Sequence, residues 1–558
     1  MNSLFFAQVG GALSWGLFIF AFGACVGSLT NVLVYRLPLG LDVVTSPSRC
    51  PQCGNRLTWR ENIPVLGWLM LRGRCRFCRS RISPEYPMVE AFVGLLFLCV
   101  FVLWYQLPAD ATWLGVEWGN ARPKWAMIDH FDGFPRHSWG PFTAVIMLFG
   151  ALTAMTLVDF KTCTIPLQIP WFATVVAILF HTAGAAIEGP LPAHFRSPLS
   201  SWTIPLPGGG EADPHSIWSG IGATFGGVLG LGVSLVLLHF GLIRRSFDDY
   251  AEWEAKALAD QAGTSGALGT PSDAATVHPE PTGYQGILPN AASQPTLNTA
   301  GPVGEQSGDG AWLTLRFLIW TIASLVALAS AGVALARTSQ GLPQWCGLVM
   351  GGVVAPMIGA VAIRGRVRRA EAAAPKLGTD PASTGSEASQ SPTAMWIQYP
   401  HARREMFKEL LFLTPCMGLT WLGGWAFAHV SWPVNRQMFW LVVLAGVLMG
   451  YLIGGGLVWG VRIAGSLAFG KEAIGLGDVH LMAAVGACVG WIDAVLAFPL
   501  AAMVGLYCTI VGWIITGRVG RAMSFGPYLA GATLIVVLGI RLVDVGLSWL
   551  YGKPIDLP

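Results

Sequence analysis

Two aspartates stand out because each of them lies at the end of a largely apolar run. Asp159 follows the run Ala151–Val158, and Asp478 opens the run that continues to Val489. Ionisable side chains at membrane depth are costly, so they are candidates for a functional site. Two neighbouring carboxylates cannot both ionise easily, and one then keeps a proton while the other acts as a base toward water. That chemistry is typical of an aspartyl protease and makes Asp159 and Asp478 the candidate catalytic pair.

The surroundings of Asp478 add a second, weaker signal. Gly475 and Gly477 precede it, and a glycine lets another part of the backbone approach closely because it has no side chain. His480 follows two residues later. A Gly-x-Gly-Asp string is nevertheless a weak motif in a chain with 69 glycines. The alternative is that each aspartate is a helix-end residue in contact with interfacial water.

Four of the eleven cysteines form two Cys-x-x-Cys knuckles, which are Cys50 with Cys53 and Cys75 with Cys78. Each knuckle places two thiolates on one tight turn, and two such turns can close a tetrahedral four-sulfur site around Zn²⁺. The metal would be structural and would fold an otherwise polar loop. Two disulfides are the alternative, which a reducing cytoplasmic location disfavours.

The elements that must position these residues are membrane-spanning helices. Of the 558 residues, 53% are hydrophobic and 12% are charged, against roughly 25% charged in an average soluble domain. Apolar runs of about 20 residues, the length needed to cross a bilayer, recur along the chain. The sequence therefore predicts an all-α polytopic membrane protein with about 12 transmembrane helices and a cytoplasmic zinc-binding loop. The basic residues lie in loops without interleaved aromatics, so no nucleic-acid binding is predicted.

The hydropathy pattern places these spans as follows. They are expected at Gly10–Val34, Tyr86–Tyr105, Pro141–Val158, Pro166–Ile187, Ile217–Ile243, Leu313–Ala336, Trp345–Ile363, Phe407–Val430, Met438–Ile463, Leu476–Val489, Ala494–Ile515 and Pro527–Leu550. The span at Leu476–Val489 is short. The first span shows no cleavage site and is expected to stay in the protein as a membrane helix.

This pattern divides the chain into five predicted segments. They are the first helix (1–37), the zinc-binding loop (38–85), helices with the first aspartate (86–188), extra helices with disordered linkers at 246–311 and 365–405 (189–465), and helices with the second aspartate (466–558). The linkers are rich in Ala, Gly, Pro, Ser and Thr and cannot bury enough surface to offset chain entropy. Eight arginines between Arg49 and Arg81 predict that the first loop is cytoplasmic and that both termini lie outside.

Several segments, in their order along the chain, resemble the prepilin leader peptidases, which are intramembrane aspartyl proteases with a Gly-x-Gly-Asp motif. The matching segments are Gly27–Pro38, Cys50–Gly54, Asn62–Leu69, Arg72–Cys78, Ile82–Glu90, the segment around Asp159, Gly475–Asp478 and Ser524–Leu529. The resemblance covers residues 10–106, 141–187 and 470–550 and leaves 190–465 uncovered.

The resemblance implies an enzyme of the bacterial inner membrane. Such enzymes cut the leader from type IV prepilins and pseudopilins after a glycine, on the cytoplasmic face, and then N-methylate the new terminus with S-adenosylmethionine. Asp159 and Asp478 would be the protease pair, and the cysteine quartet would be the zinc site. The chain departs from the pattern at His480, where the family usually has lysine, and at Leu167.

Methylation rests on the resemblance alone. No glycine-rich loop after a strand offers a nucleotide-binding site, and the run Gly454–Gly456 is typical of close helix packing.

Two other functions remain open at this point. One is a related intramembrane aspartyl protease with other substrates, because the Gly-x-Gly-Asp string is shared more widely than the amino-terminal segments. The other is a non-catalytic secretion-system scaffold or transporter that keeps the fold. A transporter needs no cytoplasmic zinc loop, and no pair of broken helices in matching halves is found. The sequence makes no prediction of the oligomeric state.

Overall fold

The protein is described by a computed structural model that is helical apart from one short hairpin. The described residues are 3–43, 45–108, 112–113, 116–117, 138–188, 214–250, 252–253, 256, 401–430, 432, 438–516, 524–539, 543 and 552. Within these residues the hairpin pairs β1 (Thr112–Trp113) with β2 (Val116–Glu117) in antiparallel register. The predicted helical membrane fold is thus confirmed, with this small addition.

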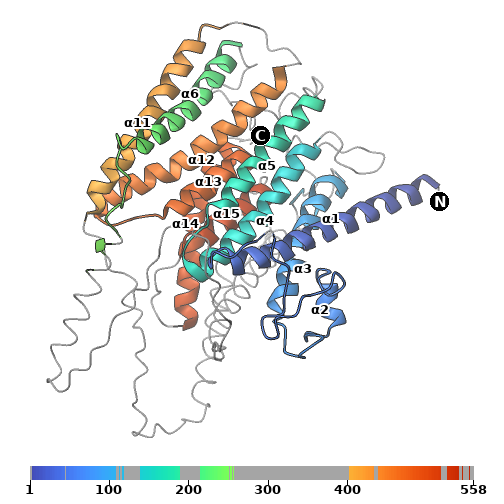
Figure 1. Ribbon diagram of the computed structural model, residues 1–558. Helices are drawn as coiled ribbons and strands as arrows, with labels where there is room; N and C mark the ends of the chain where they lie inside the picture. The colour runs from blue at the N-terminus through green and yellow to red at the C-terminus, as the bar shows by residue number, and fades with distance from the viewer. Residues whose placement is uncertain are drawn as a thin grey trace, which may run out of the picture.

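The helices follow the apolar runs of the sequence (Figure 1). They are α1 (Ser3–Arg36), α2 (Leu66–Met70), α3 (Glu85–Phe101) with a π-helical continuation η1 (Val102–Gln106), α4 (Trp139–Thr162), α5 (Gln168–Glu188), α6 (Pro214–His239), α11 (Ala402–Phe427), α12 (Phe439–Phe469), α13 (Leu476–Val489), α14 (Trp491–Thr516) and α15 (Gly526–Leu538).

Eight of these helices are long and apolar enough to cross a membrane, and α13 and α15 are shorter apolar helices. Each of them corresponds to a predicted span. The predicted spans Leu313–Ala336 and Trp345–Ile363 lie outside the described residues, as do most of the two predicted linkers and the part of the last predicted span after residue 539, apart from Val543.

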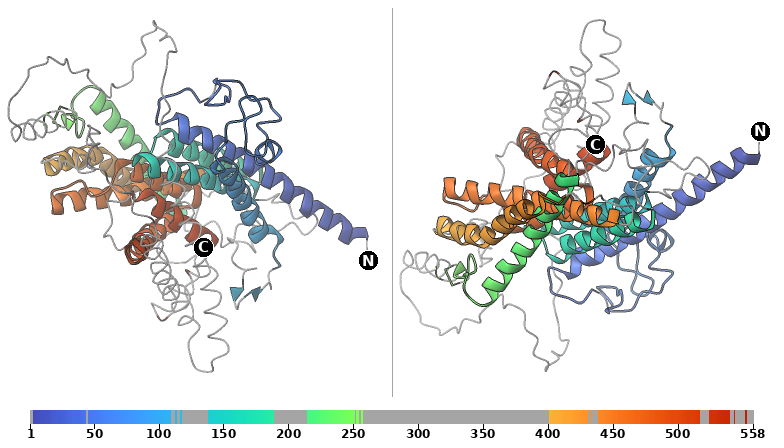
Figure 2. Two further views of the ribbon diagram at one scale, coloured as in Figure 1. Left: turned by 90° about the horizontal axis from the view of Figure 1, so that it is seen from below. Right: turned by 90° about the horizontal axis from the view of Figure 1, so that it is seen from above.

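Helix α13 lies in the middle of the bundle. It packs against α4, α5, α12, α14 and α15. Figure 2 shows the orange and red C-terminal helices gathered beside the teal helices α4 and α5, in views from below and above. Its 14 residues span about 21 Å at 1.5 Å per residue, which is less than the ~30 Å of the hydrocarbon core. Because α13 begins at Leu476, it carries Asp478 in its first turn.

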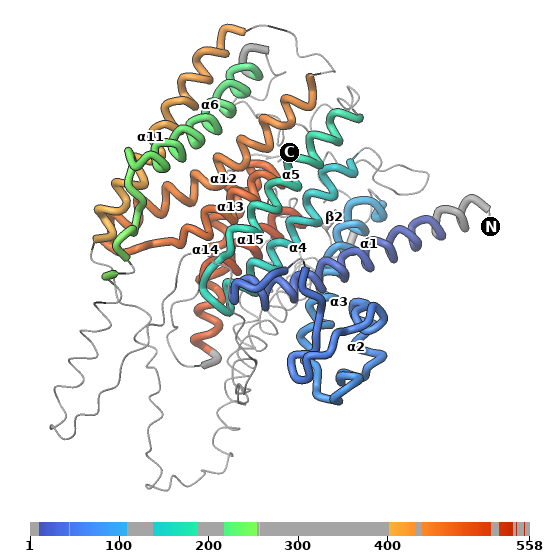
Figure 3. Tube along the Cα trace, in the orientation of Figure 1, coloured from blue at the N-terminus to red at the C-terminus, as the bar shows by residue number. Residues whose placement is uncertain are grey.

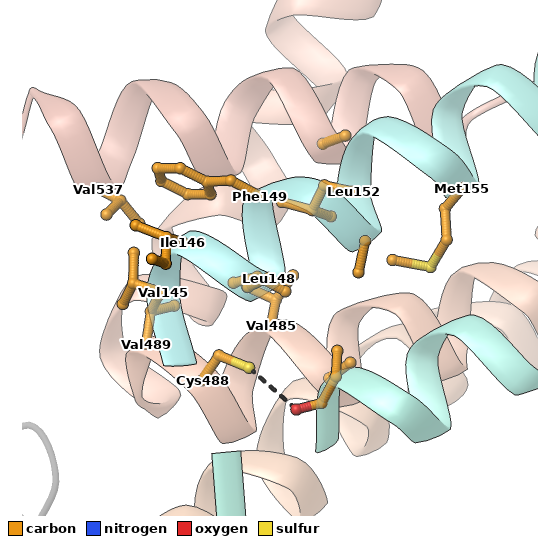
Figure 4. Close-up of a cluster of buried hydrophobic side chains, with 14 of the residues drawn as sticks. Val145, Ile146, Leu148, Phe149, Leu152, Met155, Val485, Cys488, Val489 and Val537 are labelled. Carbon is orange, nitrogen blue, oxygen red and sulfur yellow. Dashed lines mark hydrogen bonds between the residues drawn. The ribbon is translucent and has the colours of Figure 1, made fainter. Parts of the chain in front are cut away.

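The core joins α13 to α4. Leu148 of α4 and Val485 of α13 are both fully buried. Figure 4 shows their side chains next to each other, with Phe149 of α4 directed toward Val537 of α15. Close-packed interiors transmit small displacements, so this core fixes the two helices that carry the aspartates relative to each other.

Glycines bring α12 and α13 into backbone contact. A Cβ atom added to Gly450 would overlap the carbonyl of Gly486, and one added to Gly486 would overlap the carbonyl of Gly450. Gly454 meets Met482 in the same way. The Gly454–Gly456 run thus includes a residue in close helix packing, as its position in a span predicts.

Helices α6 and α11 form a pair at one edge of the molecule, on the far side of α12 from α4 (Figures 1 and 3). They touch through small residues, because Gly222 of α6 faces Gly423 of α11 and Gly230 faces Cys416. At the opposite edge, α1 packs against α3 and α4. The loop between α1 and α3, which contains Cys50, Cys53, Cys75 and Cys78 and is called the cysteine-rich loop, lies below α3 in Figure 3.

Candidate active site and metal centre

Asp159 lies in the last turn of α4 and is buried. The helix ends at Thr162 because Cys163 adopts a left-handed conformation, with φ of 52°, and donates its backbone N–H to the carbonyl of Asp159 at 2.7 Å. Pro166 follows and has no backbone N–H with which to continue a helix. The aspartate is therefore fixed immediately before a turn into α5.

Asp478 lies in the first turn of α13 and is also buried. Gly475 is the extended residue that precedes the helix, with φ of −68° and ψ of 149°, and its backbone hydrogen-bonds the Asp478 carboxylate. A helix N-terminus stabilises a carboxylate because its free N–H groups carry partial positive charge.

The fold brings the two aspartates to the same end of the bundle, where their charges act on each other. Ile165, in the turn after α4, connects the segments. A Cβ on Gly477 would lie 2.9 Å from Ile165 Cβ, and a Cβ on Gly526 would lie 3.3 Å from Ile165 Cδ1. The absence of side chains at these glycines lets the turn carrying Ile165 sit against both helix starts.

A third segment reaches Asp159 from the start of α15. The Ser524 hydroxyl and the backbone of Gly526 are hydrogen-bonding neighbours of the Asp159 carboxylate. A Cβ on Gly526 would lie only 2.5 Å from Asp159 Oδ2. That oxygen is buried and has no hydrogen-bond partner of good geometry in the described part of the chain. Sequence reasoning did not assign Ser524 and Gly526 to the site, although both lie in the segment Ser524–Leu529 that supported the resemblance.

The other predicted site residues are Gly475, Gly477 and His480, which lie close to Asp478 in the chain. Gly475 and Gly477 flank the second aspartate as expected. His480 is on α13, two residues beyond Asp478, and residues at this spacing do not face each other on a helix. The side chains of Asp478 and His480 therefore point to different sides of α13.

The cysteine quartet comes together in the loop between α1 and α3. The four Sγ atoms of Cys50, Cys53, Cys75 and Cys78 lie within 4.8 Å of one another. The Cys50–Cys78 and Cys53–Cys75 sulfurs are 3.9 and 4.0 Å apart, and all four thiols are unpaired. Tetrahedral coordination with Zn–S bonds of about 2.3 Å requires sulfurs about 3.8 Å apart. The donor set therefore fits zinc in number, chemistry and spacing.

Two matching turns build this arrangement. The N–H of Gly54 donates to the Cys50 carbonyl at 2.9 Å, and the N–H of Arg79 donates to the Cys75 carbonyl at 3.0 Å. Hydrogen bonds from the side chain and backbone of Ser80 lower the pKa of the Cys78 thiol to about 6. A thiolate is the form that binds metal, so this loop favours the ligating state.

The loop is attached to the helices beside the aspartates. The N–H of Val65 donates to Glu90 Oε2 of α3 at 2.7 Å. Lys161, two residues after Asp159, pairs with Glu85 at the start of α3 at 3.1 Å. The candidate metal centre and the candidate catalytic pair therefore belong to the same end of the molecule.

Comparison with known sequences confirms the resemblance inferred from the motifs. Residues 21–104 match the family described as Bacterial Peptidase A24 N-terminal domain. The match contains α3 and the complete cysteine quartet, and it ends before Asp159.

Curated relatives carry names of the same kind. A prepilin leader peptidase/N-methyltransferase of Myxococcus xanthus is 53% identical over 83 residues, which are 15% of this chain and 25% of the relative. One from Dickeya chrysanthemi is 27% identical over 244 residues, 38% of this chain and 75% of the relative. A type 4 prepilin-like proteins leader peptide-processing enzyme of Escherichia coli is 36% identical over 152 residues, 24% and 54%.

The extent of these matches differs between relatives. The chain spans a quarter of the Myxococcus xanthus protein and 40% of a relative from Klebsiella pneumoniae. No solved structure matches the chain. Together with the apolar helices, the relatives support a multi-pass bacterial membrane protein.

Proposed function

We propose that this chain is an aspartyl endopeptidase of the bacterial inner membrane that removes the leader from type IV prepilins or pseudopilins after a glycine, on the cytoplasmic face. The observation that carries the proposal is the burial of Asp159 and Asp478 at one end of the helical bundle, beside the cysteine-rich loop. The names of the relatives supply the substrate class. The arginine-rich first loop supports a cytoplasmic position for that end.

The proposed reaction is hydrolysis of one peptide bond by the carboxyl pair. One aspartate is protonated and the other is ionised, because two adjacent carboxylates do not share a buried site as two full charges. The ionised aspartate takes a proton from water, and the resulting hydroxide adds to the scissile carbonyl, whose oxygen receives the proton of the other aspartate. Collapse of this tetrahedral intermediate breaks the C–N bond: the leaving amine takes the proton from the aspartate that deprotonated water, and one hydroxyl of the intermediate gives its proton back to the other aspartate.

The contacts of Asp159 suit such a role. Its Oδ2 atom is buried without a hydrogen-bond partner of good geometry among the described residues, which leaves a lone pair for a water molecule, a proton or a substrate group. Buried polar atoms usually have partners, and an exception calls for an explanation. The proposed function supplies that explanation.

A second proposed activity is methyl transfer to the new terminal amine. It is favoured by the names of two relatives, which include N-methyltransferase. The methyl donor would be S-adenosylmethionine, and no residue in the described ranges is assigned to binding it.

The cysteine quartet is proposed to bind one structural zinc ion. Its four thiolates leave no open coordination position, and a closed four-sulfur site stabilises a fold without activating water. The ion would hold together the two knuckles of a loop that has few large buried side chains.

The test uses a pilin-type precursor from the same organism and the full-length protein in membranes. Cleavage immediately after the glycine of the leader, located by mass spectrometry of both products, is the expected result. A precursor with a bulky residue in place of that glycine is the matched control and is expected to remain intact. Cleavage of unrelated membrane peptides but not of the precursor would favour a protease with other substrates. An absence of any cleavage would favour the non-catalytic scaffold or transporter.

A further inference from the structure

A buried arginine lies between the edge helix pair and the segment that carries Asp478. Arg462 of α12 is 2% exposed, and a charge in such a place is stable only when it is paired and hydrogen-bonded. Its guanidinium reaches in two directions. One side contacts Glu409 of α11, and the other contacts the loop 470–475, which joins α12 to α13 and ends directly before the helix that carries Asp478.

Both carboxylate oxygens of Glu409 accept hydrogen bonds. Arg462 Nε and Nη2 donate to Glu409 at 3.2 and 3.1 Å. The indole N–H of Trp459 donates to the same carboxylate at 2.8 Å. Glu409 is 4% exposed, so the ion pair is well shielded from solvent. Charge-assisted bonds in this forked geometry fix orientation as well as supply energy.

The contact with the loop uses the remaining nitrogen. Arg462 Nη1 donates to Glu472 Oε1 at 2.6 Å and to the carbonyl oxygen of Ile474. Two further side chains hold the loop backbone in the described residues: the Ala473 N–H donates to Ser466 Oγ at 3.0 Å, and the backbone of Gly475 hydrogen-bonds the Asp478 carboxylate. Ile474 is four residues before Asp478, so a shift of this loop moves the start of α13.

The partner helix reaches the same place by a second route. Arg403, near the start of α11, donates to the carbonyls of Leu467 at 3.0 Å and Ala468 at 3.4 Å, in the last turn of α12. The ring of Phe247, in the segment after α6, lies 5.7 Å from the Arg462 guanidinium. Helix α11 and the segment after α6 therefore both contact the second half of α12, directly before the loop that precedes Asp478.

We propose that Glu409 and Arg462 are positioning residues of the active site, through which the α6–α11 pair holds the loop 470–475 and with it Asp478. The inference rests on the proposed function for its catalytic consequence. Helices α6 and α11 lie within residues 190–465, which the motif resemblance leaves uncovered. Their proposed role is to support the loop that positions the second aspartate.

The first test compares Glu409→Gln, Arg462→Lys and the control Asp249→Asn in precursor cleavage. Asp249, in the segment after α6, pairs with Arg404 of α11 at 2.8 Å, and its side chain is 45% exposed, so it is a partly exposed ion-pair residue for comparison with the buried pair. A misplacement of about 1 Å in a catalytic group costs about 100-fold in rate, and we expect kcat of the first two variants to fall by about that factor, with KM unchanged. Lysine keeps the charge but lacks the planar fork that joins Glu409 to the loop. The control is expected to retain the wild-type rate.

A double variant separates positioning from folding. Replacing both members of a buried ion pair is often tolerated, because no buried unpaired charge remains. Glu472, the other partner of Arg462, has a side chain that is 48% exposed, so its charge keeps contact with water. Glu409→Gln with Arg462→Met is therefore expected to fold with a thermal unfolding midpoint near wild type and still to lose kcat. Recovery of kcat in this double variant would overturn the proposal, since the pair would then serve folding alone.

A measurement without substrate tests directly whether Glu409 holds the loop 470–475 in place. Hydrogen exchange of residues 470–478, followed by mass spectrometry, is expected to be faster in Glu409→Gln than in wild type or Asp249→Asn. Unchanged exchange, or faster exchange with full cleavage activity, would overturn the proposal. If the wild-type protein cleaves no precursor, the proposed function fails, and the exchange data still decide whether Glu409 holds the loop.

Discussion

At the scale of single residues, the proposed catalytic role depends on the surroundings of each carboxylate. Asp159 and Asp478 were predicted from their positions beside apolar runs, and the structure places both of them, buried, at one end of the bundle. Their catalytic role stays a prediction. The sequence did not indicate that Gly526 lies against Asp159, because their separation along the chain carries no information about that contact.

Gly526 offers the sharpest test of this environment. Gly526→Ala would place a Cβ 2.5 Å from Asp159 Oδ2, so the carboxylate must move. We expect cleavage of a pilin-type precursor to fall by about 10- to 100-fold, since small misplacements of catalytic groups are costly. Gly531→Ala is the control on the same helix, because a Cβ there meets nothing within 4 Å. Equal rates for the two variants would contradict the described packing.

The cysteine quartet gives a prediction about metal content. Wild-type protein should contain one zinc ion per chain by plasma mass spectrometry, and Cys75→Ser should contain little, because three sulfurs do not close the site. Cys99→Ser, which alters a thiol outside the quartet, should keep the full content. Equal zinc in both variants would exclude the quartet as the metal site.

The low pKa of Cys78 gives a pH-dependent prediction for the metal-free loop. After zinc is removed with a chelator, the alkylation rate of Cys78 should rise as pH increases through about 6 and level off above it, because the Ser80 hydrogen bonds favour the thiolate. Ser80→Ala should move the midpoint upward, toward the value of an ordinary thiol. A wild-type midpoint near that of the other exposed cysteines would show that the Ser80 bonds do not act as described.

At the scale of helices, hydropathy predicted most elements and little of their arrangement. The bounds of α13 were predicted correctly as Leu476–Val489, because flanking glycines mark both ends. The small hairpin β1–β2 was missed, since two residues in each strand leave no periodic signal. The two predicted spans between 313 and 363 lie outside the described residues and stay predictions, as does the division into five segments.

The contact between α12 and α13 is testable at this scale. Gly450→Ala would push a methyl group into the backbone of Gly486, and overpacking of this kind costs about 1–3 kcal/mol. We expect a lower thermal unfolding midpoint in detergent and reduced cleavage. Gly456→Ala, on the same helix with open space around it, should unfold like wild type. A wild-type midpoint for Gly450→Ala would show that the helices are not in backbone contact there.

At the scale of the whole molecule, the fold gathers its functional segments at one end. Lys161 and Glu85 tie the helix of the first aspartate to the base of the cysteine-rich loop, and Arg462 ties the loop before the second aspartate to the edge pair. The motifs predicted the segments of the cysteines and of the two aspartates separately, and hydropathy predicted the helices of the edge pair. Contacts between residues so far apart in the chain, such as Glu409 with Arg462, are set by helix packing and could not be predicted from periodicity or composition.

The most direct test of the two-aspartate mechanism is the rate at which a pilin-type precursor from the same organism is cleaved. The proteins compared are wild type, Asp159→Asn, Asp478→Asn and the control Asp249→Asn, and each is first shown to be inserted in membranes. Asparagine keeps the shape of the side chain and removes its acid–base function. We expect wild type and the control to cleave the leader, and each active-site variant to be slower by about 1,000-fold or more. Wild-type activity in either Asp159→Asn or Asp478→Asn would contradict the two-aspartate mechanism.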